Sequence, residues 1–291
     1  MVEGQPFIGS EALAAGRLNR HGLRTHYRAA YPDVYVPGQV SLRLDQRTIA
    51  AWLWSGRRGV VAGPAAAALH GARWVDDDVP VELVHANPRA PVGVITRRET
   101  LLDDEMQMLT GQDNGMLVTT PDRTAFDIGR HQPLRPAVAQ LDALARATHF
   151  DVDVVAALTL RHPRVRGLRQ LEQVLSLVDP GAESPRETYL RLLLTDAGLP
   201  PDQTQIPVPT ADATYYLDMG WPDVMVAAEY DGEHHQVDSL QWRKDIIRLE
   251  TLARMGWIVI RVVARDRAPA VVWRVRQALQ VRGYSPAFIV R

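Results

Sequence analysis

The order of hydrophobic patterns in the last third of the sequence constrains the fold more than any other feature. Apolar residues at helical spacing lie between residues 185 and 197, and Gly198 follows them as a stop. Three strand-like segments, a helical pattern, a β-rich apolar run and a last helical pattern come next, at 204–208, 214–218, 224–230, 238–255, 257–263 and 268–282. These patterns predict an αβββαβα domain over residues 183–291, with WIVIRVV at 257–263 as a buried strand.

The segment DPGAESP, residues 179–185, marks a domain boundary because Pro, Gly and Ser cluster there between two helical patterns. Residues 7–40 hold a helix-turn-helix-like pattern, with Ser10 and Asn19 as expected N-caps, followed by the strand DVYVPG. The region between predicts helices at 46–56, 64–71, 120–130, 134–147 and 166–178 and strands at 79–84 and 92–97. The chain is therefore predicted to be α+β, with domains at 1–44, 45–182 and 183–291.

The composition argues against a secreted, disulfide-bonded or membrane-spanning protein. The 291 residues include no cysteine, which excludes disulfides and thiolate metal sites. The N-terminus has no signal-peptide pattern, and no apolar run reaches the roughly 18 residues that a membrane helix needs. We therefore expect a soluble cytoplasmic protein with no membrane partner.

The basic residues are unevenly distributed, although the net charge is −1. Lys244 is the only lysine, so nearly all basic residues are arginines. A GC-rich genome explains this arginine bias; the alternative is a need to bind phosphate, which the planar arginine side chain contacts through two hydrogen bonds. Residues 1–59 carry eight arginines and four acids, so we expect Arg20, Arg24 and Arg28 to contact nucleic acid; a solvated polar face is the alternative. Residues 243–291 carry eleven basic residues and three acids.

Between these basic regions lies an acidic segment. No basic residue occurs between Arg191 and Arg243, where nine acids stand: Asp196, Asp202, Asp212, Asp218, Asp223, Glu229, Asp231, Glu233 and Asp238. Asp218 closes one predicted strand, and Glu229 and Asp231 end the next, two residues apart and hence on one face. If the strands are adjacent, three carboxylates converge and require a counter-ion. Mg²⁺ or Mn²⁺, with a polyanion whose phosphates reach the metal, meets that requirement.

Two other chemistries fit less well. A glycosidase pair would need an aromatic sugar-binding groove, and the flanks offer only Trp221, Tyr230 and Trp242. A zinc site at His234 and His235 is disfavoured because adjacent residues of a strand point apart and no H-x3-H spacing occurs.

Residues 183–266 resemble an uncharacterised bacterial family related to very-short-patch-repair endonucleases, which belongs to the PD-(D/E)XK nuclease superfamily. The likeness rests on SPRETYLRLLLTDAGLP, TQIPV, YLDMGWPDVMVAAEYDGEHHQ and RKDIIRLETLARMGWIVIRV. These stretches contain an acid near the start of the first helix, a D-x10-E pair, an E-x-D-G-x-x-H string, a D-x-x-R helix and a G-x-x-V-x-R strand. The resemblance implies a restriction-endonuclease-like fold.

The upstream region resembles AbiEi-like antitoxin and regulator proteins, through FIGSEALAAGRLNRHGLR, PDVYVPG, VVAGPAAAALHGA and VTTPDRTAFDIGRH. This resemblance implies a winged-helix-like region at 1–44, a middle domain at 45–182, and a cognate toxin or regulatory protein as a partner beside DNA.

Carried over from the nuclease family, the metal-binding acids are Asp218 and Glu229, with Asp231 as a third. Glu187 matches the first-helix acid, although Ser184 to Glu187 also reads as an S-x-x-E capping box. His235 matches the G-x-x-H position, which implies that it positions water or phosphate; a free surface histidine is the alternative.

One departure from the superfamily pattern bears on activity. Asp231 stands where the pattern has lysine, and Lys244 or Arg248 on the next helix could supply the cation and bind DNA; Asp245 and Arg248 could also simply pair on the helix surface. Three hypotheses follow: a Mg²⁺-dependent DNA endonuclease, a non-catalytic DNA-binding regulator or antitoxin that keeps the nuclease fold, and a protein–protein module.

Overall fold

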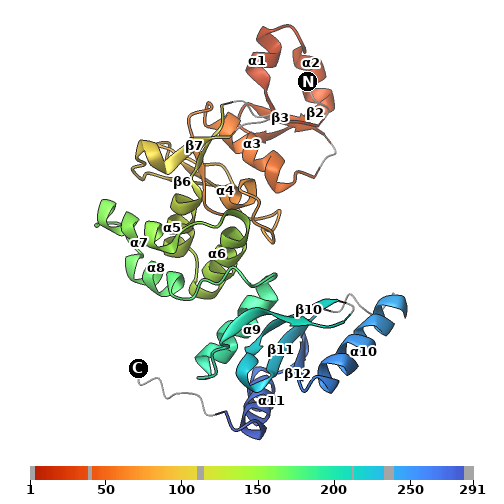
Figure 1. Ribbon diagram of the computed structural model, residues 1–291. Coiled ribbons are helices and arrows are strands. Elements are labelled where there is room, and N and C mark those ends of the chain that lie inside the picture. Colours follow the sequence, from red (N-terminus) through yellow and green to blue (C-terminus); the bar gives the residue numbers. More distant parts are fainter. Residues whose placement is uncertain (1–3, 39–40, 110–114, 212, 233–238, 285–291) are drawn as a thin grey trace. The chain divides into compact units, whose positions relative to one another are not determined.

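The computed structural model describes residues 4–38, 41–109, 115–211, 213–232 and 239–284 (Figure 1). The chain divides into two compact units, Met1–Val178 and Asp179–Arg291. Both units mix helices with strands, and the described residues form three sheets, so the α+β class is confirmed. The finer division at residue 44 stays a prediction. No helix in the described parts of the chain is long and apolar enough to cross a membrane.

The first unit begins with a small antiparallel sheet in the order β1-β3-β2, formed by Phe7–Ile8, Val34–Pro37 and Tyr27–Tyr31. Two short helices lie between β1 and β2: α1 (Gly9–Ala14) and α2 (Arg20–His26). Asn19 caps α2 as predicted, since its side chain accepts a 2.7 Å hydrogen bond from the Gly22 amide. The prediction that Ser10 caps the first helix is wrong. Ser10 lies inside α1, and its hydroxyl donates to Asp33.

The second sheet of this unit has the strand order β6-β5-β4-β8-β7. Its strands are β4 (Val60–Ala62), β5 (Val81–Val84), β6 (Val94–Arg97), β7 (Met106–Met108) and β8 (Leu117–Thr119). The helices are α3 (Leu44–Trp54), α4 (Gly63–Leu69), α5 (Pro121–His131), α6 (Leu134–Thr148), α7 (Val152–Arg161) and α8 (Leu168–Leu175), with a 3-10 turn η1 at Asp103–Glu105. The sequence patterns located most of these elements within a few residues but missed α7, β4, β7 and β8.

A buried ionic network holds α5 to the segment before it. The Arg123 side chain is 1% exposed and donates to Glu105 at 2.5 Å, Asp127 at 3.0 Å and Glu99 at 2.9 Å. Arg130 joins the network through Glu99 and Asp127. Because each carboxylate has a guanidinium partner, the cost of burying these charges is offset within the cluster.

The second unit follows the predicted order of helix, three strands, helix, strand and helix. These elements are α9 (Pro185–Asp196), β9 (Gln203–Pro209), β10 (Thr214–Trp221), β11 (Val226–Asp231), α10 (Ser239–Arg254), β12 (Ile258–Val263) and α11 (Ala268–Val281). A 3-10 turn, η2 (Pro222–Val224), joins β10 to β11 and contains Asp223. The sheet order is β12-β11-β10-β9, with β11 and β12 parallel and the other pairs antiparallel.

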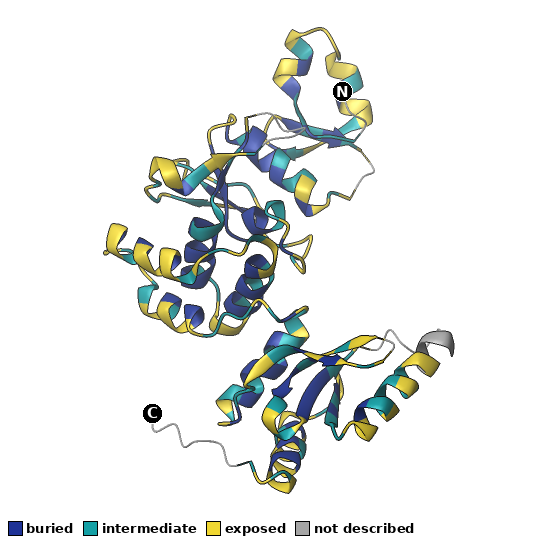
Figure 2. Cartoon of the chain, viewed as in Figure 1, coloured by how far each residue is buried: buried dark blue, intermediate teal, exposed yellow. Residues whose placement is uncertain are grey.

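Helices cover both faces of this sheet (Figure 1, Figure 2). One core joins α9 and α11 to the sheet through residues such as Leu194, Val226 and Val275. The opposite core includes Ala227 together with Leu252 of α10. Alternate residues of β11 thus enter different cores, as a strand buried on both faces requires. Helix α10, which bears the predicted DNA-binding cations, lies on the second face.

Candidate active site

The strand β10 is irregular at Asp218. Leu217 pairs with Ile206 and Met219 with Thr204, and the position between, where Gln205 faces Asp218, is skipped. Gln205 has a left-handed backbone with φ of 47°, which costs free energy in a non-glycine residue. Leu217 and Met219 enter opposite cores although they are two residues apart. The strand therefore changes face here, and such irregularities re-aim side chains beside functional sites.

Asp218, Glu229 and Asp231 line one pocket of about 130 Å³ in the second unit. The strands β10 and β11 are adjacent, and the last paired residues before the site are Met219 and Ala228. One residue further along, Asp218 and Glu229 come opposite each other. The structure thus brings together the three carboxylates that the sequence selects.

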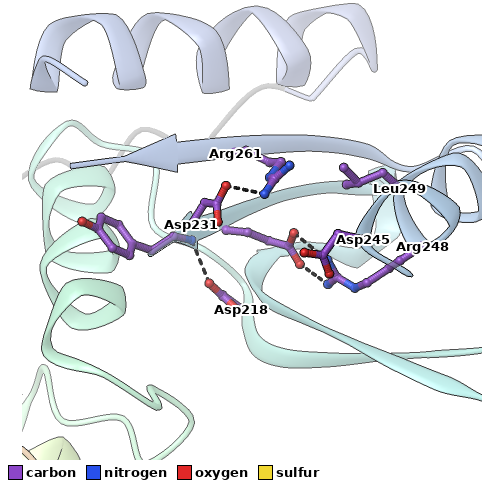
Figure 3. Close-up of a pocket in the computed structure, with 8 residues that line it drawn as sticks. Asp218, Asp231, Asp245, Arg248, Leu249 and Arg261 are labelled. Atoms are coloured by element: carbon purple, nitrogen blue, oxygen red, sulfur yellow. Dashed lines mark hydrogen bonds and ion pairs between the residues drawn. The ribbon is translucent and has the colours of Figure 1, made fainter. Parts of the chain in front are cut away.

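Two arginines supply the positive charge. Arg248 on α10 makes a two-pronged ion pair with Glu229, one prong being Nη1 to Oε2 at 3.0 Å, and its Nη2 also donates to the Tyr216 carbonyl at 2.9 Å. Arg261 on β12 pairs with Asp231. Figure 3 shows Asp231 turned toward Arg261, with Arg248 entering from α10. Arg248 thus reaches across to the sheet, and Asp245 of the same helix lines the same pocket.

Among the residues that the structure describes, no arginine forms an ion pair with Asp218. Its Oδ2 accepts a 2.8 Å hydrogen bond from the Tyr230 amide. Burial and the negative charge of Glu187 raise the pKa of Asp218 to about 7, and the charge of Glu229 adds to that rise, while the Tyr230 amide and Arg248 oppose it. Asp218 therefore exchanges a proton near neutral pH, and a cation beside it would be stabilised.

Ser184 caps α9 as predicted, and Glu187 takes part in this cap. Its backbone amide donates to the Ser184 hydroxyl at 3.3 Å, and that hydroxyl donates to Glu187 Oε1 at 2.9 Å. The other carboxylate oxygen accepts from the Glu183 amide at 2.7 Å. Its effect on the pKa of Asp218 shows that the same carboxylate also acts on the site. The two interpretations of Glu187 are compatible.

The remaining candidate residues are placed as follows. Lys244 is exposed on α10, and Gln205 is absent from the pocket lining. Arg20 and Arg24, one turn apart on α2, and Arg28 on β2 are exposed. His235, with Glu233, His234 and Asp238, lies outside the described residues.

The donor atoms suit a hard divalent ion such as Mg²⁺ in kind, since all are carboxylate oxygens. The carboxylates are not arranged as a metal site in this conformation. Within the described ranges, no group of three or more His, Cys, Asp or Glu side chains is placed to hold a metal. Both oxygens of Glu229 are engaged by Arg248. Metal binding by Asp218 and Glu229 therefore requires Arg248 to move from Glu229.

The sequence patterns did not predict a role for Arg261 in the site, although Arg261 is the last residue of the G-x-x-V-x-R strand motif. It interrupts an apolar strand, and a charge within such a run calls for a buried partner. That partner, Asp231, lies on the neighbouring parallel strand, where Glu229 is in register with Arg261.

Comparison with known proteins gives relatives without an assigned activity. No protein-family model matches the chain. Two curated proteins of Mycobacterium tuberculosis are each 29% identical over 154 residues: Uncharacterized protein MT2308 of strain CDC 1551 / Oshkosh and Uncharacterized protein Rv2248 of strain ATCC 25618 / H37Rv. The match covers 53% of this chain and 57% of each relative, so the chain spans little more than half of their length.

Proposed function

We propose that residues 183–291 form a PD-(D/E)XK-type domain that cleaves DNA phosphodiester bonds with Mg²⁺ or Mn²⁺. The observation that carries this proposal is the convergence of Asp218, Glu229 and Asp231 in one pocket at the irregular point of β10. The raised pKa of Asp218 supports it, because a buried carboxylate beside two others favours a cation.

In this proposal, Asp218 and Glu229 hold the metal, and Asp231 remains tied to Arg261. The metal would activate water and neutralise charge on the phosphoryl group. Arg248, released from Glu229, would bind a DNA phosphate with its guanidinium fork, and Lys244 on the same helix would add an exposed cation. His235, outside the described residues, would position water or phosphate. Glu187 would tune Asp218 while capping α9.

The second candidate is a non-catalytic DNA-binding regulator or antitoxin-like protein that retains the nuclease fold. A specific observation favours it: Arg248 and Arg261 already neutralise Glu229 and Asp231 within the chain. A site in this state needs no metal counter-charge. The winged-helix-like region at 1–44 and a cognate toxin or regulatory protein belong to both candidates, as does a cytoplasmic location.

Metal-dependent melting separates a working metal site from an arginine-neutralised one. A metal that binds only the folded state at a hundredfold excess over its Kd stabilises the fold by about 2.7 kcal/mol. We expect Mg²⁺ or Mn²⁺ to raise the melting temperature of the wild type but not of Asp218→Asn, with Glu250→Gln on the exposed part of α10 as the control. No rise up to about ten millimolar metal would favour the second candidate.

DNA binding by the first unit is tested separately. Arg20, Arg24 and Arg28 are exposed, and an arginine that neutralises one DNA phosphate adds about one unit to the slope of log affinity against log salt concentration. The triple Ala variant should therefore bind duplex DNA more weakly and with a shallower salt slope than the control Arg73→Ala, an exposed arginine of the same unit. Unchanged affinity and slope would remove DNA binding from this surface.

A further inference from the structure

The first unit contains a larger pocket, of about 950 Å³, that the proposed nuclease function does not use. It lies at one edge of the five-stranded sheet and is lined from Val84 to Asn87, from Arg97 to Thr100, and by Trp54 to Gly56 with Arg58. Strands β5 and β6 are parallel, and β4 runs antiparallel to β5. The carboxyl ends of β5 and β6 therefore share this edge, the position at which open sheets bind ligands.

Arginine side chains dominate the charge of this pocket. Arg97 forms an ion pair with Glu82, whereas Arg98 Nε donates to the Ala86 backbone carbonyl at 3.2 Å. In the described part of the chain, neither Arg58 nor Arg98 forms an ion pair with a carboxylate. Both are exposed toward solvent. Two guanidinium groups are thus available to an incoming anion.

The one acid in the lining, Glu99, does not cancel these charges. Its Oε2 accepts hydrogen bonds from Arg123 at 2.9 Å and Arg130 at 2.6 Å, and His131 lies 3.2 Å from its Oε1. Burial raises the pKa of Glu99, but the hydrogen bond from His131 and the charges of Arg130 and Arg123 outweigh it and hold the pKa at about 2. Glu99 is therefore ionised and directed at Arg123 and Arg130, which it shares with Glu105 and Asp127 of the buried network.

A tight turn after α3 fixes the position of Arg58. The Ser55 hydroxyl accepts hydrogen bonds from the amides of Arg58 at 3.2 Å and Gly59 at 2.9 Å. Gly56 and Arg57 both have left-handed backbones, with φ of 67° and 62°, and Arg57 is anchored by its ion pair with Glu11. The turn is therefore ordered before any ligand binds, which lowers the entropic cost of binding.

Aromatic rings form another part of the wall. Trp54 and His85 lie edge to face, with ring centroids 6.1 Å apart and planes at 73°. Burial and the charge of Arg58 lower the pKa of His85, which favours its neutral ring. The carboxyl end of α3 adds a small negative potential, equivalent to about half an elementary charge. The two arginines carry more positive charge than this. The pocket thus offers cations for phosphate beside flat surfaces for a base.

We propose that this pocket binds a nucleotide, free or as part of a single-stranded nucleic acid, with Arg58 and Arg98 holding phosphate and Trp54 and His85 facing the base. Its volume is sufficient for a ligand of nucleotide size. Aromatic side chains stack on any base, so we expect the pocket to bind nucleotides without preference for one base.

Calorimetric titration of the full-length protein tests this site with AMP, adenosine and a short single-stranded oligodeoxythymidylate. Losing one charge-assisted hydrogen bond should weaken binding about tenfold. We expect that loss for Arg58→Ala and for Arg98→Ala, and no change for Arg73→Ala. Adenosine should bind at least about tenfold more weakly than AMP because it has no phosphate.

The outcomes decide both the site and the source of the ligand. Arginine-dependent binding of AMP supports a free nucleotide, and arginine-dependent binding of the oligonucleotide alone supports a polynucleotide. The proposal is overturned if neither AMP nor the oligonucleotide binds, or if Arg58→Ala and Arg98→Ala bind as the wild type does. It is also overturned if AMP binds and adenosine binds as tightly. Thermal melting of each variant checks that the fold is retained; both side chains are exposed, so the melting temperature should be unchanged.

Discussion

Replacing Asp218 with Asn should stabilise the second unit at neutral and alkaline pH. The folded protein raises the pKa of Asp218 from 3.8 to about 7, through burial and the neighbouring charges of Glu187 and Glu229. One pKa unit corresponds to about 1.4 kcal/mol, so the ionised carboxylate costs at most about 4 kcal/mol in the folded state. Asn removes that charge and still offers an oxygen to the Tyr230 amide. We expect a gain of about 1–3 kcal/mol above pH 8.

The sign of the pH dependence follows from the direction of the shift. A carboxyl whose folded pKa is raised contributes stability that is complete below its unfolded pKa of 3.8 and is lost as the pH rises through about 7. The wild type should therefore lose stability across this window relative to Asp218→Asn. At pH about 4 the two proteins should be nearly equal, because Asp218 is then protonated in the folded state.

Native-state hydrogen exchange in urea is the assay, because peptides from β10 and β11 report the second unit alone. Glu250→Gln is the matched control: it removes one exposed carboxylate from α10 of the same unit and should leave the pH profile unchanged. A difference between Asp218→Asn and wild type that is constant with pH, or a variant less stable than wild type at pH about 8, would refute the assigned origin of the shift.

The remaining predictions concern the arginines that compensate buried carboxylates. Arg248→Met leaves Glu229, which is 7% exposed, without its guanidinium partner, so the second unit should lose about 3 kcal/mol in urea unfolding; adding Glu229→Gln should restore most of it. A single variant as stable as the wild type would show that the pair contributes nothing. Arg123→Met removes the buried guanidinium that pairs with Glu105 and Asp127 in the first unit, where we expect a loss of about 3–5 kcal/mol by thermal melting. Retained stability would mean that the network is not formed.

Local signals in the sequence were sufficient for most elements of the fold. Asn19 caps α2 because the cap needs only residues within one turn. Ser10 carries the same kind of signal, but a distant carboxylate, Asp33, competes for its hydroxyl. Short strands such as β4, β7 and β8 were missed because three residues do not establish a period.

The acids of the site could be predicted, whereas their partners could not. Asp218 and Glu229 stand out because the sequence patterns predict strand ends there, with no basic residue nearby in sequence. The predicted end at Asp218 is wrong, because β10 continues to Trp221 and pairs with β11 beyond it. Their partners come from distant elements, and whether Arg248 faces Asp245 or the sheet depends on how α10 packs. The irregularity at Gln205 depends on strand pairing and has no sequence signature of its own.

Metal-dependent cleavage of supercoiled plasmid tests the central claim most directly. With Mg²⁺ or Mn²⁺, the wild type and Glu250→Gln should convert supercoiled plasmid to nicked or linear forms. Glu229→Gln should lose that activity by about two or more orders of magnitude, since it removes a carboxylate proposed to hold the metal. Cleavage by Glu229→Gln at the wild-type rate, or no metal-dependent cleavage by the wild type, would contradict the account.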